Sequence, residues 1–193
     1  MRASRRLPTL LAAAALAVAA GLLPPAGPAR ARQDDPRLEA LFARLKAAGS
    51  AAEAEPVEKE IWSVWGEAGE PAGDALMARG SEALARRDHL AAREAFDELV
   101  RRAPDFAEGW NKRATLHFVA GDYRASVEDI RRTLALEPRH FGALSGLGLI
   151  YLAIDRPEAA ARSFEAALAV HPHLPGARAH VEMLKAKAAG EAL

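Results

Sequence analysis

The sequence predicts an all-α protein built from tandem pairs of helices, and three observations lead to this fold class. The 193 residues draw their hydrophobicity mostly from Ala and Leu, while aromatic residues make up only 6%. Such a mixture, with few β-branched residues, favours helix over sheet. The second half of the chain repeats with a period of 34 residues. Within each period, apolar residues recur at three- and four-residue steps, as they do on amphipathic helices.

Composition and motifs exclude several classes of function. With 26 basic and 26 acidic residues, the chain has no excess positive charge to attract nucleic acid or an anionic membrane. It contains no Cys, which excludes disulfides, thiolate metal sites and a Cys nucleophile. Neither a Gly-x-Ser-x-Gly motif nor a phosphate-binding glycine loop occurs. We therefore expect a protein that is not an enzyme and that holds no cofactor and no metal.

Residues 1–31 have the pattern of a cleaved secretory signal peptide. A basic start precedes an apolar run of about 14 residues, then several Pro residues, and Ala29 and Ala31 match a cleavage site. The run is shorter than the roughly 20 residues that span a membrane, although an uncleaved anchor is the alternative. Cleavage would leave 22 basic residues against 26 acidic ones. The expected mature protein begins at Arg32, is mildly acidic, and is periplasmic or secreted.

Residues 32–72 are expected to form a helical cap region. A short helix from residue 36 to residue 48 should end at Gly49, and Ser50 with Glu53 has the spacing of a capping box for the next helix. Pro56 lies inside that second helix, which therefore either starts there or kinks. Trp62 and Trp65 share one helical face. They either pack under the first repeat, or one of them anchors a partner.

Three repeats are predicted, at 73–106, 107–140 and 141–174. Small residues recur where two helices must approach closely, and large residues recur beside them. The small set is Gly80, Ala114 and Gly148, and the large set is Phe96, Ile130 and Phe164. Asp88 and Asp122 suit the N-cap of a second helix, and Gly121 suits the end of the preceding one. A Pro at 104, 138 and 172 then ends each second helix.

The third unit contains Leu144-x-x-Leu147-Gly148-x-x-Tyr151, followed by Ala160-x-x-x-Phe164, Ala167 and Pro172. With three such units in tandem, the chain resembles the tetratricopeptide repeat family over about two thirds of its mature length. The second unit departs from the family pattern at Arg113, His117, Ser126, Ile130 and Thr133. The segment from Ile61 to Gly80 also resembles the region before the repeats in exported repeat proteins of high-GC proteobacteria. These resemblances imply an α-solenoid with an N-terminal helical hairpin.

Residues 175–193 are expected to form a C-terminal capping helix and tail. An array of repeats exposes apolar faces at its ends, and such a helix can cover one of them. The side chains available to cover repeat three are Ala179, Val181, Met183 and Leu184. Among the His residues, we expect His171 and His173 to be ordinary surface residues, and His89 and His117 to be packing residues.

The family resemblance implies that the first helix of each pair lines a concave groove that binds a partner's helix or peptide. The positions that it implies are Met77, Ser81, Leu84, Asn111, Thr115, Phe118, Val119, Ser145, Leu149 and Leu152. Leu84, Phe118 and Leu152 share one repeat position, so they could belong to the core instead. The N-terminal helices could also fill the groove themselves. Few cations lie nearby, which disfavours capture of a C-terminal carboxylate.

The function expected from this pattern is that of an adaptor, co-chaperone or assembly factor in the bacterial envelope. Its partner would be another protein or peptide, with no nucleic acid and with the membrane met only through the signal peptide. The alternative is a structural protein that associates with itself through the groove or the cap.

The signal-peptide hypothesis is tested by N-terminal sequencing of the exported protein. We expect the sequence to begin at Arg32, because peptidase cleavage requires the small residues that precede it. An intact Met1 on membrane-bound material would contradict the hypothesis and support the anchor.

Overall fold

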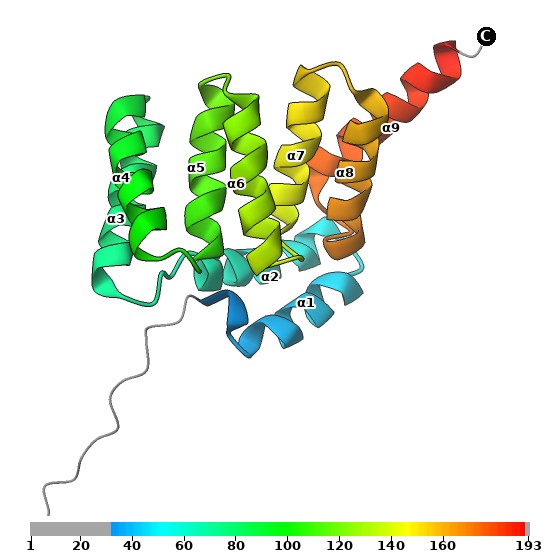
Figure 1. The fold of residues 1–193 in the computed structure, drawn as a ribbon. Coiled ribbons are helices and arrows are strands. Elements are labelled where there is room, and N and C mark those ends of the chain that lie inside the picture. The colour runs from blue at the N-terminus through cyan, green and yellow to red at the C-terminus, as the bar shows by residue number, and fades with distance from the viewer. Residues whose placement is uncertain (1–31, 192–193) are drawn as a thin grey trace, which may run out of the picture.

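A computed structural model describes residues 32–191, which form nine α-helices after one turn of 3-10 helix, η1 (Arg32–Asp34) (Figure 1). The N-terminal hairpin is α1 (Arg37–Ala47) and α2 (Ala51–Trp65). Three helix pairs follow, and one helix ends the array. These are α3 (Pro71–Ala85) with α4 (His89–Arg102), α5 (Ala107–Val119) with α6 (Tyr123–Leu136), α7 (Phe141–Ala153) with α8 (Pro157–Val170), and α9 (Pro175–Glu191). The predicted all-α repeat array, with its hairpin and its capping helix, is confirmed.

The predicted signal peptide, residues 1–31, lies outside the described residues. Within residues 32–191, no helix has the length and apolar character needed to cross a membrane.

The turns inside the helix pairs follow the sequence signals. Asp88 accepts the backbone N–H of Ala91 at 3.0 Å, and Asp122 accepts that of Ala125 at 3.1 Å, so each caps a second helix. Gly121 has a φ of 77°, which is the left-handed conformation of a helix C-terminus. The corresponding turns of the first and third pairs adopt the same conformation without Gly.

Close packing within each pair depends on a small residue facing a large one. A Cβ added to Gly80 would lie 2.5 Å from the ring of Phe96, and one added to Gly148 would lie 2.7 Å from the ring of Phe164. Ala114 replaces this Gly in the second pair, where the smaller Ile130 replaces the ring. Volume is therefore conserved across the contact in all three repeats.

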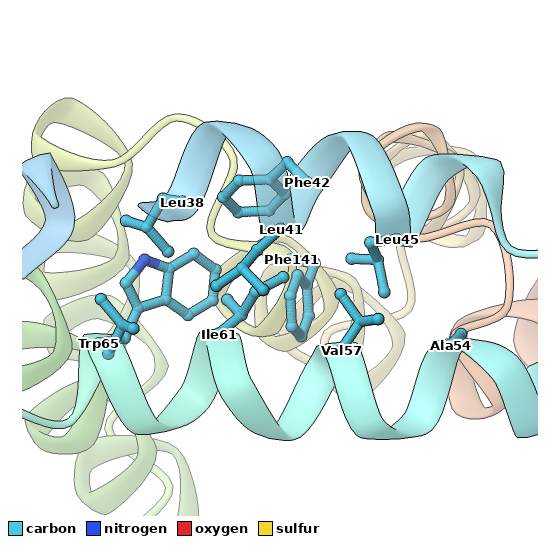
Figure 2. Close-up of a cluster of buried hydrophobic side chains, with 10 residues drawn as sticks. Leu38, Leu41, Phe42, Leu45, Ala54, Val57, Ile61, Trp65 and Phe141 are labelled. Carbon is cyan, nitrogen blue, oxygen red and sulfur yellow. The ribbon is translucent and has the colours of Figure 1, made fainter. Parts of the chain in front are cut away.

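The N-terminal hairpin forms its own apolar core. The Ser50 hydroxyl accepts the N–H of Glu53 at 3.3 Å, so Ser50 caps the helix as predicted. The Glu53 carboxylate accepts the N–H of Gly49 at 2.9 Å, one residue before the N-cap position that a standard capping box uses. The helix begins at Ala51 and continues through Pro56. Figure 2 shows the buried side chains of α1 and α2 meeting, with one ring from α7 between them. The labelled side chains are Leu38, Leu41, Phe42, Leu45, Ala54, Val57, Ile61, Trp65 and Phe141.

The hairpin lies across the turns between repeats, at one edge of the array (Figure 1). Trp65 stacks on His140 with ring centroids 4.3 Å apart, and Trp62 packs edge-on against Phe141 at 5.1 Å. The expectation that both Trp residues pack under repeat one is therefore wrong, because α2 runs beneath the turn between repeats two and three. Two further polar contacts join η1 and the hairpin to these turns. Gln33 donates to the backbone of Asp105, and Arg139 pairs with Glu39 at 2.6 Å.

Two histidines of the last turn also hold the hairpin. His171 is buried and bonds Glu58 at 3.1 Å, and His173 donates to the carbonyl of Ala48 at 2.7 Å. The expectation of ordinary surface residues is wrong for both, because the hairpin covers the turn that carries them. Among the other two, His117 is buried as expected, whereas His89 is exposed at the start of α4.

Helix α9 ends the array as a cap. Its buried face consists of Ala177, Val181 and Leu184, which pack against α8. The expected Ala179 and Met183 are exposed instead, because the buried face follows the three- and four-residue step that begins at Ala177.

The small–large pairing predicts how the core responds to substitution. Gly148→Ala is expected to lower the free energy of unfolding by about 1–2 kcal/mol, since overpacking outweighs the gain in helix propensity. Adding Phe164→Ile recreates the Ala114–Ile130 pair of repeat two and should restore most of the loss. Urea denaturation of the single and double variants measures this coupling. Strictly additive effects of the two substitutions would contradict it.

Candidate binding groove

A cavity of about 260 Å³ opens on the concave face between α5 and α7. Five of the predicted groove residues line it, and α5 and α7 bring them together. They are Asn111, Thr115, Phe118, Ser145 and Leu149. The structure therefore places the hollow part of the groove on repeats two and three.

The remaining predicted residues lie elsewhere. Met77 is 8% exposed and belongs to the core of repeat one, against which Leu84 also packs. Leu152 packs against the core of repeat three. Ser81 is half-buried and donates to the Met77 sulfur at 3.7 Å, and Val119 is half exposed outside the cavity lining. The implied lining by Met77, Leu84 and Leu152 is thus corrected to core packing, because these side chains point between helices.

Eight cavity residues lie outside the predicted groove set, and three of them shape the hollow. Trp62 reaches the cavity from α2, and Gly142 and Gly146 open it on α7. The two glycines stand where repeat two has Glu108 and Lys112. The two glycines remove side chains from one face of the helix, and this pattern could have predicted the cavity from the sequence. The position of Trp62 could not be predicted in this way, because it depends on where the hairpin packs.

Trp62 is held in place by a shared carboxylate. Its indole N–H donates to one Glu58 oxygen at 3.1 Å, and the other Glu58 oxygen bonds His171 Nε2 at 3.1 Å. His171 Nδ1 accepts the backbone N–H of His173, so Nε2 carries the hydrogen and donates it. The ring of Trp62 is therefore positioned by α2 and by the last inter-repeat turn together.

A second buried histidine–carboxylate pair lies at the base of the groove. His140 is fully buried, and its Nδ1 accepts the backbone N–H of Ala143 at 3.1 Å, which caps α7. Its Nε2 therefore donates to Glu108, at 2.9 Å. Asn111 donates to the same Glu108 oxygen at 2.8 Å. This network connects Trp65, stacked on His140, to a residue that lines the cavity.

Glu108 is ionised in this network. Burial by itself would raise the pKa of this carboxyl, but the hydrogen bond from His140, the charge of Lys112 and the hydrogen bond from the Asn111 amide together outweigh it. The pKa of Glu108 accordingly lies below its ordinary value. Lys112 stands 3.3 Å from the other oxygen of the same carboxylate.

Cations near the groove are engaged by acidic partners. Arg113 of α5 makes a two-point contact with Asp129 at 2.8 and 2.9 Å and also bonds Asp97 at 2.9 Å. Lys112 pairs with Glu108. Among the described residues that line the cavity, none is charged. The lining thus offers apolar surface with hydroxyl and amide groups at its edge.

Within residues 32–191, no group of three or more acidic, His or Cys side chains is placed to hold a metal ion. Fold and groove together define a helical repeat protein with a preformed concave surface.

Comparison with known proteins identifies which repeat family this is. The tetratricopeptide repeat profile matches residues 77–121 and 111–175. A TPR repeat-containing protein of Rhizobium etli is 38% identical over 154 residues, which cover 80% of this chain and 76% of the relative. The chain belongs to the tetratricopeptide repeat family.

Solved structures share the fold. The first tetratricopeptide domain of Spaghetti, bound to the HSP90 peptide SRMEEVD, superposes with a TM-score of 0.58 at 18% identity. The match covers 61% of this chain and 93% of that one. The TPR2B domain of yeast Sti1, in a complex with pHsp70, gives a TM-score of 0.56 at 20% identity over 63% and 99% of the two chains.

The buried carboxylate predicts a pH-dependent contribution to stability. Glu108→Gln should lower the free energy of unfolding at pH 7 by about 1.5–3 kcal/mol, because hydrogen bonds to a buried charge are lost. Since the folded pKa lies below the unfolded one, this stabilisation is present above the unfolded pKa and is lost as the pH falls through the folded value. The difference from the unaltered protein should therefore shrink below about pH 4.5.

Thermal denaturation between pH 7 and pH 3 measures this difference. Glu98→Gln is the matched control, since that partly exposed carboxylate pairs with Arg101 and Arg102 of its own helix and should matter little. A Glu108→Gln penalty that stays constant down to pH 3 would rule out the ionised network.

Proposed function

We propose that this protein is an exported scaffold of the bacterial envelope that holds a helix or peptide of a partner protein in its concave groove. The observation that carries the proposal is the open, uncharged cavity between α5 and α7. A preformed apolar groove with a few polar groups at its edge is suited to an amphipathic helix or an apolar peptide. Its role would be that of an adaptor, co-chaperone or assembly factor.

The position of the hairpin supports a partner from outside the chain. Helix α2 lies across the inter-repeat turns and contributes only Trp62 to the cavity. The hairpin therefore supplies a wall of the groove and leaves its volume open. The peptide complexes of Spaghetti and of yeast Sti1 are precedents for such use of the same fold.

Export is supported by the sequence of residues 1–31, with its basic start, apolar run and Ala-x-Ala ending. The Rhizobium etli relative is consistent with a bacterial source.

Self-association is the less favoured candidate. In α7, the side that packs against the second helix of the pair carries Leu144, Gly148 and Tyr151. One repeat period later, α9 has Arg178, Glu182 and Lys185 at the equivalent positions. A further helix stacked there would bury three charged side chains. Light scattering over a range of concentrations tests this alternative, since a mass that falls on dilution would support a homodimer.

The groove is tested by a crosslinking pull-down with the double variant Asn111→Ala/Phe118→Ala. We expect the partner to be lost, because both side chains line the cavity and neither is fully buried. Leu90→Ala is the control, as Leu90 is 70% exposed on α4 and should leave partner capture unchanged. If the double variant remains folded by circular dichroism and still retains the partner, the groove is not the binding surface.

A further inference from the structure

The cavity owes its depth to one glycine of α7. A Cβ added to Gly146 would meet a single atom among the described residues within 4 Å, the Ile130 Cδ1 at 3.7 Å, which is an ordinary contact. Gly142, one turn earlier, differs because a Cβ there would lie 2.6 Å from the Trp62 ring. Gly142 thus admits Trp62, while the space above Gly146 stays open.

The walls and the floor of this space are apolar. Trp62, Phe118 and Leu149 line its sides, and the floor reaches the buried Ala114 and Ile130. Ser126 also reaches the floor, but its hydroxyl donates to the carbonyl of Ala114 at 2.8 Å. The whole cavity, about 260 Å³, exceeds the ~150 Å³ of an apolar protein cavity that holds benzene. It is therefore large enough for one aromatic or branched aliphatic side chain.

The uncharged lining of the cavity restricts which kind of side chain can bind in it. The lining residues within the described part of the chain carry no charge, and the nearest acidic groups, Glu58 and Glu108, are bonded to His171 and His140. A charged side chain inserted here would be buried without a partner, which is strongly unfavourable. An uncharged apolar side chain would instead leave water for an apolar environment, which is favourable.

The rim suits the backbone that would carry such a side chain. Asn111 donates its amide hydrogen to Glu108, which leaves its carbonyl oxygen as an acceptor. The Thr115 hydroxyl donates to the backbone carbonyl of Asn111 at 3.0 Å, and its oxygen keeps lone pairs that can accept. Backbone N–H groups of a bound segment can donate to both.

We propose that the space above Gly146, called the anchor pocket, receives one large uncharged apolar side chain of the partner segment. The proposal rests on the proposed function and specifies the residue of the partner that decides recognition. It also makes the site composite, since the Trp62 wall belongs to the hairpin while the rest belongs to repeats two and three.

The experiment uses a phage-displayed library of random 12-residue peptides, selected on the purified protein. We expect the selected peptides to share one Phe, Trp, Leu, Ile or Met whose replacement by Ala weakens binding about tenfold or more, as expected for one fully buried apolar side chain. Gly146→Leu, which fills the pocket from within, should weaken binding to a similar extent.

Two further variants make the comparison specific. Gly190→Leu makes the same change near the end of α9, where an added Cβ meets nothing within 4 Å among the described residues, and should leave peptide affinity unchanged. Gly146→Ala only narrows the pocket and favours the helix, so it should remain folded. Selection on this variant should shift the shared residue towards smaller side chains.

The outcomes separate this proposal from the proposed function. Peptides that need Asn111 and Phe118 but tolerate Gly146→Leu would overturn the anchor pocket and leave groove binding standing. Peptides that bind without dependence on Asn111 or Phe118 would overturn both. An unchanged residue preference after Gly146→Ala would also overturn the anchor pocket.

Discussion

The stacking of Trp65 on His140 is the contact on which the rest of the structure depends. His140 is the N-cap of α7, its other ring nitrogen holds Glu108 of α5, and its face carries the hairpin through Trp65. One buried side chain thereby joins the start of repeat three to repeat two and to α2. Because every polar atom of this imidazole is satisfied, the ring can be buried without cost from an unpaired group. The placement of Trp62 in the groove follows from this docking.

The inter-repeat turns show how a repeated sequence acquires a non-repeated function. Phe106, His140 and Leu174 occupy one position of the 34-residue period, yet each differs in chemistry. The N-terminal segment meets the three turns through different residues, Gln33 of η1 at the first, Trp65 at the second and Glu58 at the third. Positions between paired helices keep their volume instead, as Gly148 with Phe164 and Ala114 with Ile130 illustrate. The repeats are thus alike in the packing within each helix pair, and they differ from one another at the edge that the hairpin covers.

The groove likewise combines residues at regular repeat positions with residues that depart from the repeat pattern. Its hydroxyl, amide and apolar side chains lie on the first helices at positions that the repeat period predicts, such as Asn111, Thr115 and Leu149. The depth of its cavity comes from Gly146 and its wall from Trp62, which belong to the departures from regularity. Binding specificity in a repeat family can be expected to reside in such departures, since the regular positions maintain the fold.

The sequence by itself determined the helices, their pairing and their caps, because these depend on neighbours three or four residues away or on a fixed 34-residue interval. Asp122, Ser50 and the Gly–Phe pairs were predictable for this reason. Only the tertiary structure decided that the hairpin crosses the turns, that His171 is buried, and that His173 bonds the carbonyl of Ala48. Those outcomes depend on contacts between residues 100 to 125 positions apart, such as Glu39 with Arg139 and Ala48 with His173. No local period specifies such contacts, so they follow only from the way that the hairpin packs against the repeats.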